Sequence, residues 1–60
     1  MTRQERQRIL QELNTDLIEA QAFIDYYERH PEEETDDNGY WAMVEAVRIQ
    51  ESIAYWRNVQ

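Results

Sequence analysis

One stretch of the chain places oxygen-bearing side chains at a spacing that can bind a cation. From residue 34 the sequence is E-T-D-D-N-G-Y-W-A-M-V-E, which sets Glu34, Asp36, Asn38 and Glu45 around Gly39. An EF-hand loop has the pattern D-x-[DN]-x-[DN]-G-x5-E, in which alternating oxygen ligands precede the glycine and a glutamate closes the site. The spacing therefore predicts a weak calcium site as one alternative.

Details of the same stretch favour a turn between two helices. Glu34 is longer than the aspartate that normally comes first, and Ala42 stands at the ninth position, where a polar group normally helps. Pro31 ends the incoming helix early. The acidic residues before the second helix can cap it and favour its positive N-terminal dipole. The candidate caps are Asp36, Asp37 and Asn38.

A second set of residues could bind an anion. All six basic residues are arginine, and the planar guanidinium suits bidentate binding of carboxylate or phosphate. The predicted ligand-binding residues are Arg57, Gln50, Arg6, Arg3 and Tyr26. The competing interpretation is that each arginine pairs with a glutamate at helical spacing. The available partners are Glu5, Glu12 and Glu51.

No residue pattern indicates catalysis. The chain contains no cysteine and no glycine-rich phosphate loop, and its single histidine is His30, next to Pro31. Ser52 has no histidine at helical spacing, so a small residue that allows close helix contact explains it better. We expect a protein that is not an enzyme and that needs no cofactor.

Two helices must position these residues. The capping box T-R-Q-E predicts that the first helix starts after Thr2, and the restraint that Pro31 puts on its predecessor predicts an end near Arg29. The predicted elements are a helix at about 3–29, an acidic turn at about 30–39 and a helix at about 40–58. The first helix has a heptad seam of Leu10, Leu13, Leu17, Ala20, Ile24 and Tyr27, and the second has Ala42, Ala46, Ile49, Ile53 and Trp56. The expected fold is one all-α domain over 1–60, an antiparallel two-helix hairpin.

The hairpin leaves apolar side chains outside its seam. Sixty residues bury a small core, and helices that are apolar on most sides are buried on most sides. We therefore expect a homo-oligomer, most simply a four-helix dimer. The alternative is a monomer with a few exposed aromatic residues. The predicted interface consists of Ile18, Ala22, Tyr26, Met43, Val47, Ala54 and Trp56.

The net charge of −7 narrows the choice of partners. It argues against direct binding to nucleic-acid phosphates and favours a basic partner or simple solubility. No apolar run approaches the ~20 residues that span a membrane, so we expect a cytoplasmic protein that does not bind membranes.

The sequence resembles a family of small phage helical-hairpin proteins over about its last forty residues. The similarity lies in Ile49-Gln50-Glu51-Ser52-Ile53, in Tyr55 and Trp56, and in a hairpin with an acidic turn. That family includes sponges that sequester cyclic nucleotide signals of bacterial CBASS and Thoeris immunity. The resemblance implies a non-enzymatic oligomer in the host cytoplasm whose nucleotide pockets form between subunits.

Three functional hypotheses follow. The first is a phage-type anti-defence protein that sequesters a cyclic nucleotide. The second is a small acidic inhibitor or adaptor that binds a host protein, in one version by imitating DNA with its carboxylates. The third is a bundle whose only task is assembly.

Overall fold

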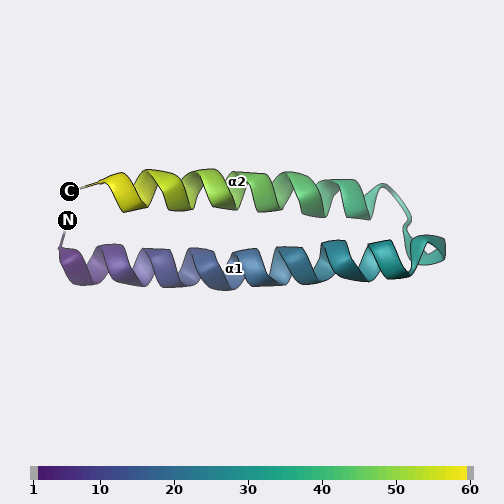
Figure 1. The fold of residues 1–60 in the computed structure, drawn as a ribbon, viewed down its shortest axis with the longest axis horizontal. Helices are drawn as coiled ribbons and strands as arrows, with labels where there is room; N and C mark the ends of the chain where they lie inside the picture. Colours follow the sequence, from purple (N-terminus) through teal and green to yellow (C-terminus); the bar gives the residue numbers. More distant parts are fainter. Residues whose placement is uncertain (1, 60) are drawn as a thin grey trace.

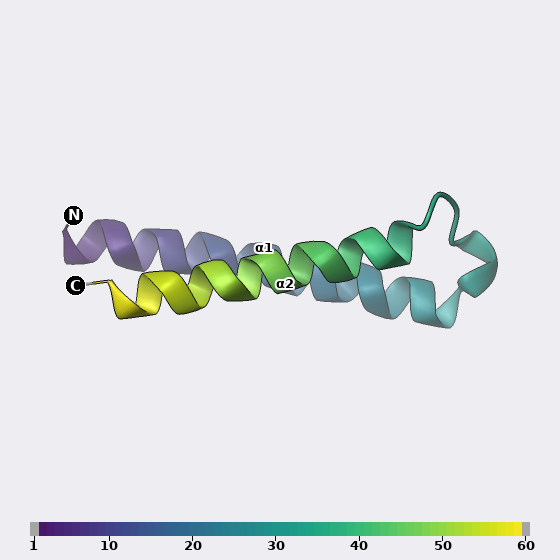
Figure 2. The same ribbon diagram turned by 90° about the horizontal axis from the view of Figure 1, so that it is seen from above.

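The computed structural model describes residues 2–59 and shows two helices that pack against each other. Helix α1 spans Arg3–Arg29, a short 3-10 turn η1 spans Pro31–Glu33, and helix α2 spans Asn38–Asn58. Figure 1 shows the two helices side by side, with both ends of the chain at one end of a rod of 46 × 14 × 13 Å. From above, the helices cross at a shallow angle (Figure 2). No strand occurs within residues 2–59, so the prediction of an all-α, two-helix fold is confirmed.

The first helix begins and ends for reasons that are local. The Thr2 hydroxyl accepts a hydrogen bond from the Glu5 backbone N–H at 3.1 Å, which satisfies one of the unpaired donors of the first turn. At the other end the His30 backbone N–H donates to the Tyr26 carbonyl at 2.9 Å. Pro31 then starts η1 and excludes a continuation of α1.

Helix α2 is capped in a different way from the prediction. It begins at Asn38, two residues before the predicted start, and its N-cap residue Asp37 makes no side-chain capping hydrogen bond. Asp36 and Asp37 both have left-handed backbone angles, with φ of 55° and 57°. The carboxylate of Glu34 accepts from the Gly39 backbone N–H at 3.1 Å instead. Glu34, in the preceding turn, therefore caps α2. Within residues 2–59, the side chains of the three predicted caps make no capping hydrogen bond.

The core is small and follows the predicted seam. Its buried residues are Ala20 on α1 and Ala46, Ile49 and Ile53 on α2. Leucines and an isoleucine of α1 pack against them, half-buried: Leu10, Leu13, Leu17 and Ile24. Two of the four buried residues are alanines, which bury little apolar area, and no large side chain among residues 2–59 is fully buried. The core thus holds the hairpin together by a single narrow contact.

Candidate functional site

One arginine joins the two helices at the open end of the hairpin. The Arg6 guanidinium, near the start of α1, donates from Nη1 to the Val59 carbonyl at 2.5 Å. Val59 is the C-cap of α2, where carbonyl groups lack partners and the helix dipole is negative. The Nε of Arg6 is buried and has no hydrogen-bond partner among residues 2–59. Arg6 therefore closes the open end of the hairpin.

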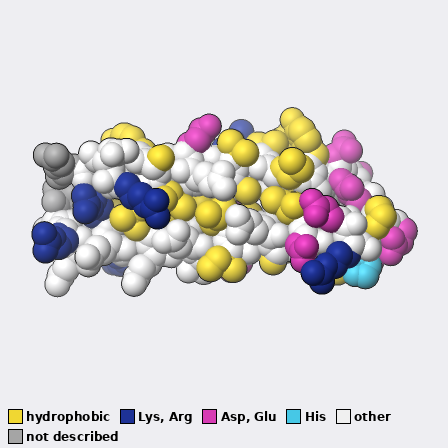
Figure 3. Space-filling model, in the orientation of Figure 1, with side chains coloured by type: hydrophobic (Ala, Val, Ile, Leu, Met, Phe, Trp, Pro, Cys, Tyr) yellow, Lys and Arg dark blue, Asp and Glu magenta, His cyan; other side chains and the backbone are white. Residues whose placement is uncertain are grey.

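The other predicted ligand-binding residues lie in two separate regions. Arg3, Gln50 and Arg57 are exposed, and no ion pair involves Arg3 or Arg57 within residues 2–59. Figure 3 shows arginine side chains at the open end and acidic side chains near the turn. Tyr26 lies twenty residues from Arg6 on the same straight helix, or ~30 Å away at 1.5 Å per residue. One chain therefore cannot bring Tyr26 to a ligand that its own Arg6 holds.

Helical ion pairs account for two of the arginines. Arg8 Nε lies 3.5 Å from Glu12 Oε1, and Arg29 Nη2 lies 3.2 Å from Asp25 Oδ2. Both pairs have the i,i+4 spacing and are well exposed, so each contributes little to the free energy of unfolding. The pairing expected for arginines thus holds for Arg8 with Glu12, whereas Arg6 contacts a backbone carbonyl.

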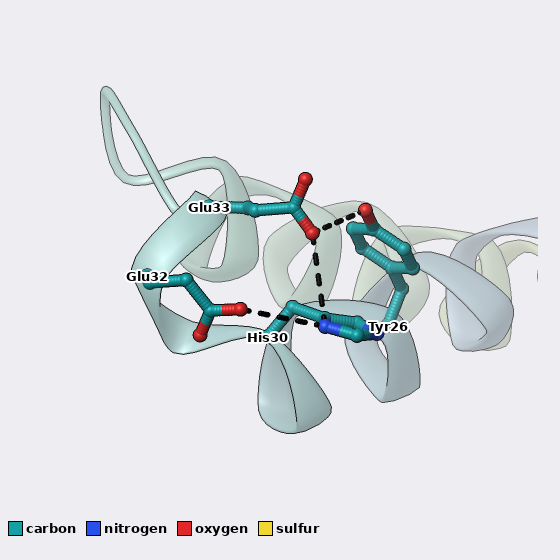
Figure 4. A network of polar contacts seen from close by, with 4 residues as sticks. All are labelled: Tyr26, His30, Glu32 and Glu33. Atoms are coloured by element: carbon teal, nitrogen blue, oxygen red, sulfur yellow. Dashed lines mark hydrogen bonds and ion pairs between the residues drawn. The ribbon is translucent and has the colours of Figure 1, made fainter.

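The turn end carries a polar cluster around His30 (Figure 4). Tyr26 Oη donates to Glu33 Oε2 at 2.5 Å, and the Tyr26 and His30 ring centroids lie 4.7 Å apart. His30 Nδ1 lies 3.5 Å from Glu32 Oε1 and 3.7 Å from Glu33 Oε2. The hydrogen bond to Glu33, then desolvation and the charge of Glu33, raises the pKa of the Tyr26 hydroxyl above its ordinary value of 10.0. The cluster joins the last turn of α1 to η1.

This cluster also brings metal-binding atom types together. One ligand atom from each of His30, Glu32 and Glu33 lies within 4.8 Å of the others, a spacing that one small cation could bridge. Sequence reasoning missed this set because it weighed the histidine alone. The available signal was the sequence H-P-E-E, in which two glutamates follow the histidine within three residues.

The predicted calcium ligands are arranged differently. The carboxylates of Glu34, Asp36 and Glu45 do not form a group with a common ligand position among the described residues. Glu34 instead caps α2, and Gly39 has a helical rather than a left-handed backbone. Asn38 and Glu45 lie within one continuous helix, two turns apart. An EF-hand loop would need the first turns of α2 to unwind.

The outer surface of the hairpin carries several large apolar side chains. Six of the seven predicted interface residues are exposed, whereas Trp56 is half-buried. Phe23, Tyr40, Trp41 and Tyr55, which lie outside the predicted interface, are also between 57% and 64% exposed. The two seams predicted from the sequence include none of these four residues.

Three open hollows in this surface adjoin one another near the turn. The first lies on α1 and is lined by Phe23 and Tyr27, and the second uses Tyr27 again with Tyr40 and Met43. The third shares Tyr40 and Met43 and extends along α2 to Val47. We call Phe23, Tyr27, Tyr40, Met43 and Val47 the turn-side apolar surface. Because neighbouring hollows share residues, this surface runs without interruption from α1 to α2.

Comparisons with known proteins found no similarity that assigns the chain to a family. No protein-family model matches it, and no match was found among curated proteins or among solved structures. Within residues 2–59, neither helix is long and apolar enough to cross a membrane.

Proposed function

We propose that this protein is a non-enzymatic binding protein that works as a homo-oligomer of helical hairpins. The observation that carries the proposal is the distribution of apolar side chains. Among residues 2–59, eight large hydrophobic side chains are exposed, whereas four residues are buried. Monomeric proteins rarely expose such contiguous apolar area unless it binds something. A small core and a large exposed apolar surface are what a subunit of a helical bundle presents before assembly.

The ligand we propose is a small anion of the cyclic nucleotide class. The open end supports this proposal, because Arg3 and Arg57 are exposed there without ion pairs within the described range. Guanidinium groups bind phosphate through two parallel hydrogen bonds. The resemblance to phage sponges gives such a ligand a role, the sequestration of an immune signal. Tyr26 could take part only from another subunit.

Isothermal titration calorimetry with a panel of cyclic di- and trinucleotides tests the ligand. We expect heat for at least one member, and we expect Arg57→Ala to weaken its binding. Arg29→Ala is the matched control, because Arg29 lies at the opposite end of the rod and pairs with Asp25. The absence of heat for every member would contradict the nucleotide proposal. Equal losses for both variants would show that only the net charge of the protein matters.

A second candidate is an acidic adaptor or inhibitor that binds a basic region of a host protein, with imitation of DNA as one version. The net charge of −7 and the acidic turn favour it, since complementary charge steers association. In this case the captured protein should elute as salt is raised, and the nucleotide panel should give no heat. Replacement of the turn carboxylates by amides should abolish capture, because it removes the negative charge that a basic partner would bind.

A further inference from the structure

We propose that the turn-side apolar surface binds the same surface of a second copy, and that the two hairpins run antiparallel. This inference rests on the homo-oligomer proposed above, and it adds the surface, the partner and the orientation. It keeps Met43 and Val47 of the predicted interface and adds Phe23, Tyr27 and Tyr40 in place of the other five residues.

The hairpin exposes more surface than a compact monomer of its mass, and the surplus matches the area that one subunit buries in a protein interface. The chain exposes 5040 Å², whereas a compact monomer of 7.4 kDa exposes about 4200 Å² according to the scaling of surface with mass. The surplus of about 800 Å² equals the area that each partner buries in a protein interface of standard size. A dimer would therefore give each hairpin the burial of a compact protein.

The position of the interface follows from the apolar side chains. Tyr40, Met43 and Val47 are each more than half exposed, and so is Phe23 on the other helix. Tyr27 links them as a residue of both the α1 hollow and the hollow between the helices. Because the surface includes both helices, it offers a broad patch to a partner. A second copy can bind this patch through the same patch of its own. Such an interface is isologous, so every contact occurs twice, related by the two-fold axis.

Charge determines the orientation. Six carboxylates lie in and beside the turn, at Glu28, Glu32, Glu33, Glu34, Asp36 and Asp37. A parallel dimer would set two such turns side by side, within the ~10 Å over which charges repel at moderate salt. An antiparallel dimer moves the two turns apart and brings each toward the arginine-bearing half of its partner. Both orientations bury the same apolar surface, but only the parallel dimer suffers the repulsion between the two acidic turns. The antiparallel dimer is therefore favoured.

Sedimentation equilibrium tests the surface. Met43→Glu puts a carboxylate into the interface, and Gln11→Glu makes the same charge change at an exposed position of α1 outside it. We expect a wild-type dimer that Met43→Glu weakens about tenfold or more, because a buried charge without a partner is costly. Gln11→Glu should leave the dimer intact. Phe23→Ala, which removes only apolar contact, should weaken association while helicity by circular dichroism persists.

Spin labels test the orientation. The chain has no cysteine, so Gln4→Cys gives one label per subunit at the open end. If the two-fold axis passes near residue 22, the labels lie ~50 Å apart in an antiparallel dimer, at 1.5 Å of helix per residue. A parallel dimer would instead bring them close together.

The outcomes separate this inference from the proposed function. A well-folded wild-type monomer at micromolar concentration would overturn both the homo-oligomer and this interface, and would assign the surface to another protein. An oligomer that Met43→Glu and Phe23→Ala leave intact would overturn only the surface. Labels close together would overturn only the orientation. Calorimetry without heat would contradict the nucleotide ligand and would leave the dimer unaffected.

Discussion

The carboxylate of Glu34 occupies the space that a side chain at Gly39 would need. Glu34 Oε1 accepts a hydrogen bond from the Gly39 backbone N–H at 3.1 Å, and a Cβ at residue 39 would lie only 2.6 Å from the same oxygen. The single glycine of the chain is therefore explained by a helix cap, since its backbone is not left-handed. The left-handed positions of the turn belong to Asp36 and Asp37.

Removing this cap should destabilise the hairpin measurably. We expect Glu34→Ala to lower the free energy of unfolding by ~1 kcal/mol, the usual effect of losing an N-terminal cap. Gly39→Ala should cost less, because displacement of the carboxylate is offset by the ~1 kcal/mol better helix propensity of alanine. Urea unfolding followed by circular dichroism gives both values. A Gly39→Ala variant that loses more than Glu34→Ala would contradict the assigned role of Glu34.

Arg6 should hold the last turn of α2 to α1. Replacement by methionine removes the hydrogen bond to the Val59 carbonyl and keeps much of the apolar stem. We expect a loss of ~1.5–3 kcal/mol, as for a hydrogen bond that involves a charged group. Faster amide hydrogen exchange should appear in the last turn of α2, whereas the middle of the helix should change less. Arg8→Met is the control, because Arg8 pairs only within α1, and it should not alter exchange at the end of α2.

Tyr26 should remain protonated to a higher pH than a free tyrosine. Glu33 accepts its hydroxyl hydrogen bond and raises the pKa of Tyr26 above 10.0. Because the folded pKa exceeds the unfolded one, the contact stabilises the fold below about pH 10 and is lost as pH rises through the folded pKa. Subtracting the ultraviolet titration of Tyr26→Phe from that of the wild type isolates this residue. Glu33→Gln should lower the pKa of Tyr26, and an unchanged midpoint would mean that the hydrogen bond does not form in solution.

The same truncation should have different effects inside and outside the core. Ile53 is buried, whereas Ile18 is 67% exposed and lies outside the turn-side apolar surface. We expect Ile53→Ala to cost ~2–4 kcal/mol, enough to unfold much of a protein with so small a core. Ile18→Ala should cost less than ~0.5 kcal/mol and should leave association unchanged. A large effect at Ile18 on self-association would instead support the interface that the sequence predicted.

The helices were predictable because the signals that form them are local. Thr2 with Glu5 marks the start of α1, Pro31 marks its end, and the spacing of Ala20, Ile49 and Ile53 identifies the side that packs. The cap of α2 was not predictable, because several acidic side chains stood within reach of the same amide. Only the path of the turn decided that Glu34 would accept from Gly39.

The candidate sites were less predictable than the helices, because they depend on how residues far apart in the sequence are placed in space. The sequence identified the arginines as candidate anion ligands, but their types could not show that Arg6 would donate to the Val59 carbonyl. Tyr26 was grouped with them by residue type, although a straight helix places it at the opposite end. The spacing of His30, Glu32 and Glu33 became a cluster only because η1 folds the two glutamates back toward the ring.

The sequence by itself determined an all-α hairpin, its seam and the surplus of apolar residues, because helical periodicity and capping act over a few residues. The tertiary structure decided which side chains are left uncovered and how they adjoin. Tyr27 on α1 lines one hollow together with Tyr40 and Met43 on α2 only because the turn that begins at Pro31 reverses the chain. Burial depends on which helix faces which, and that relation arises when the two helices pack.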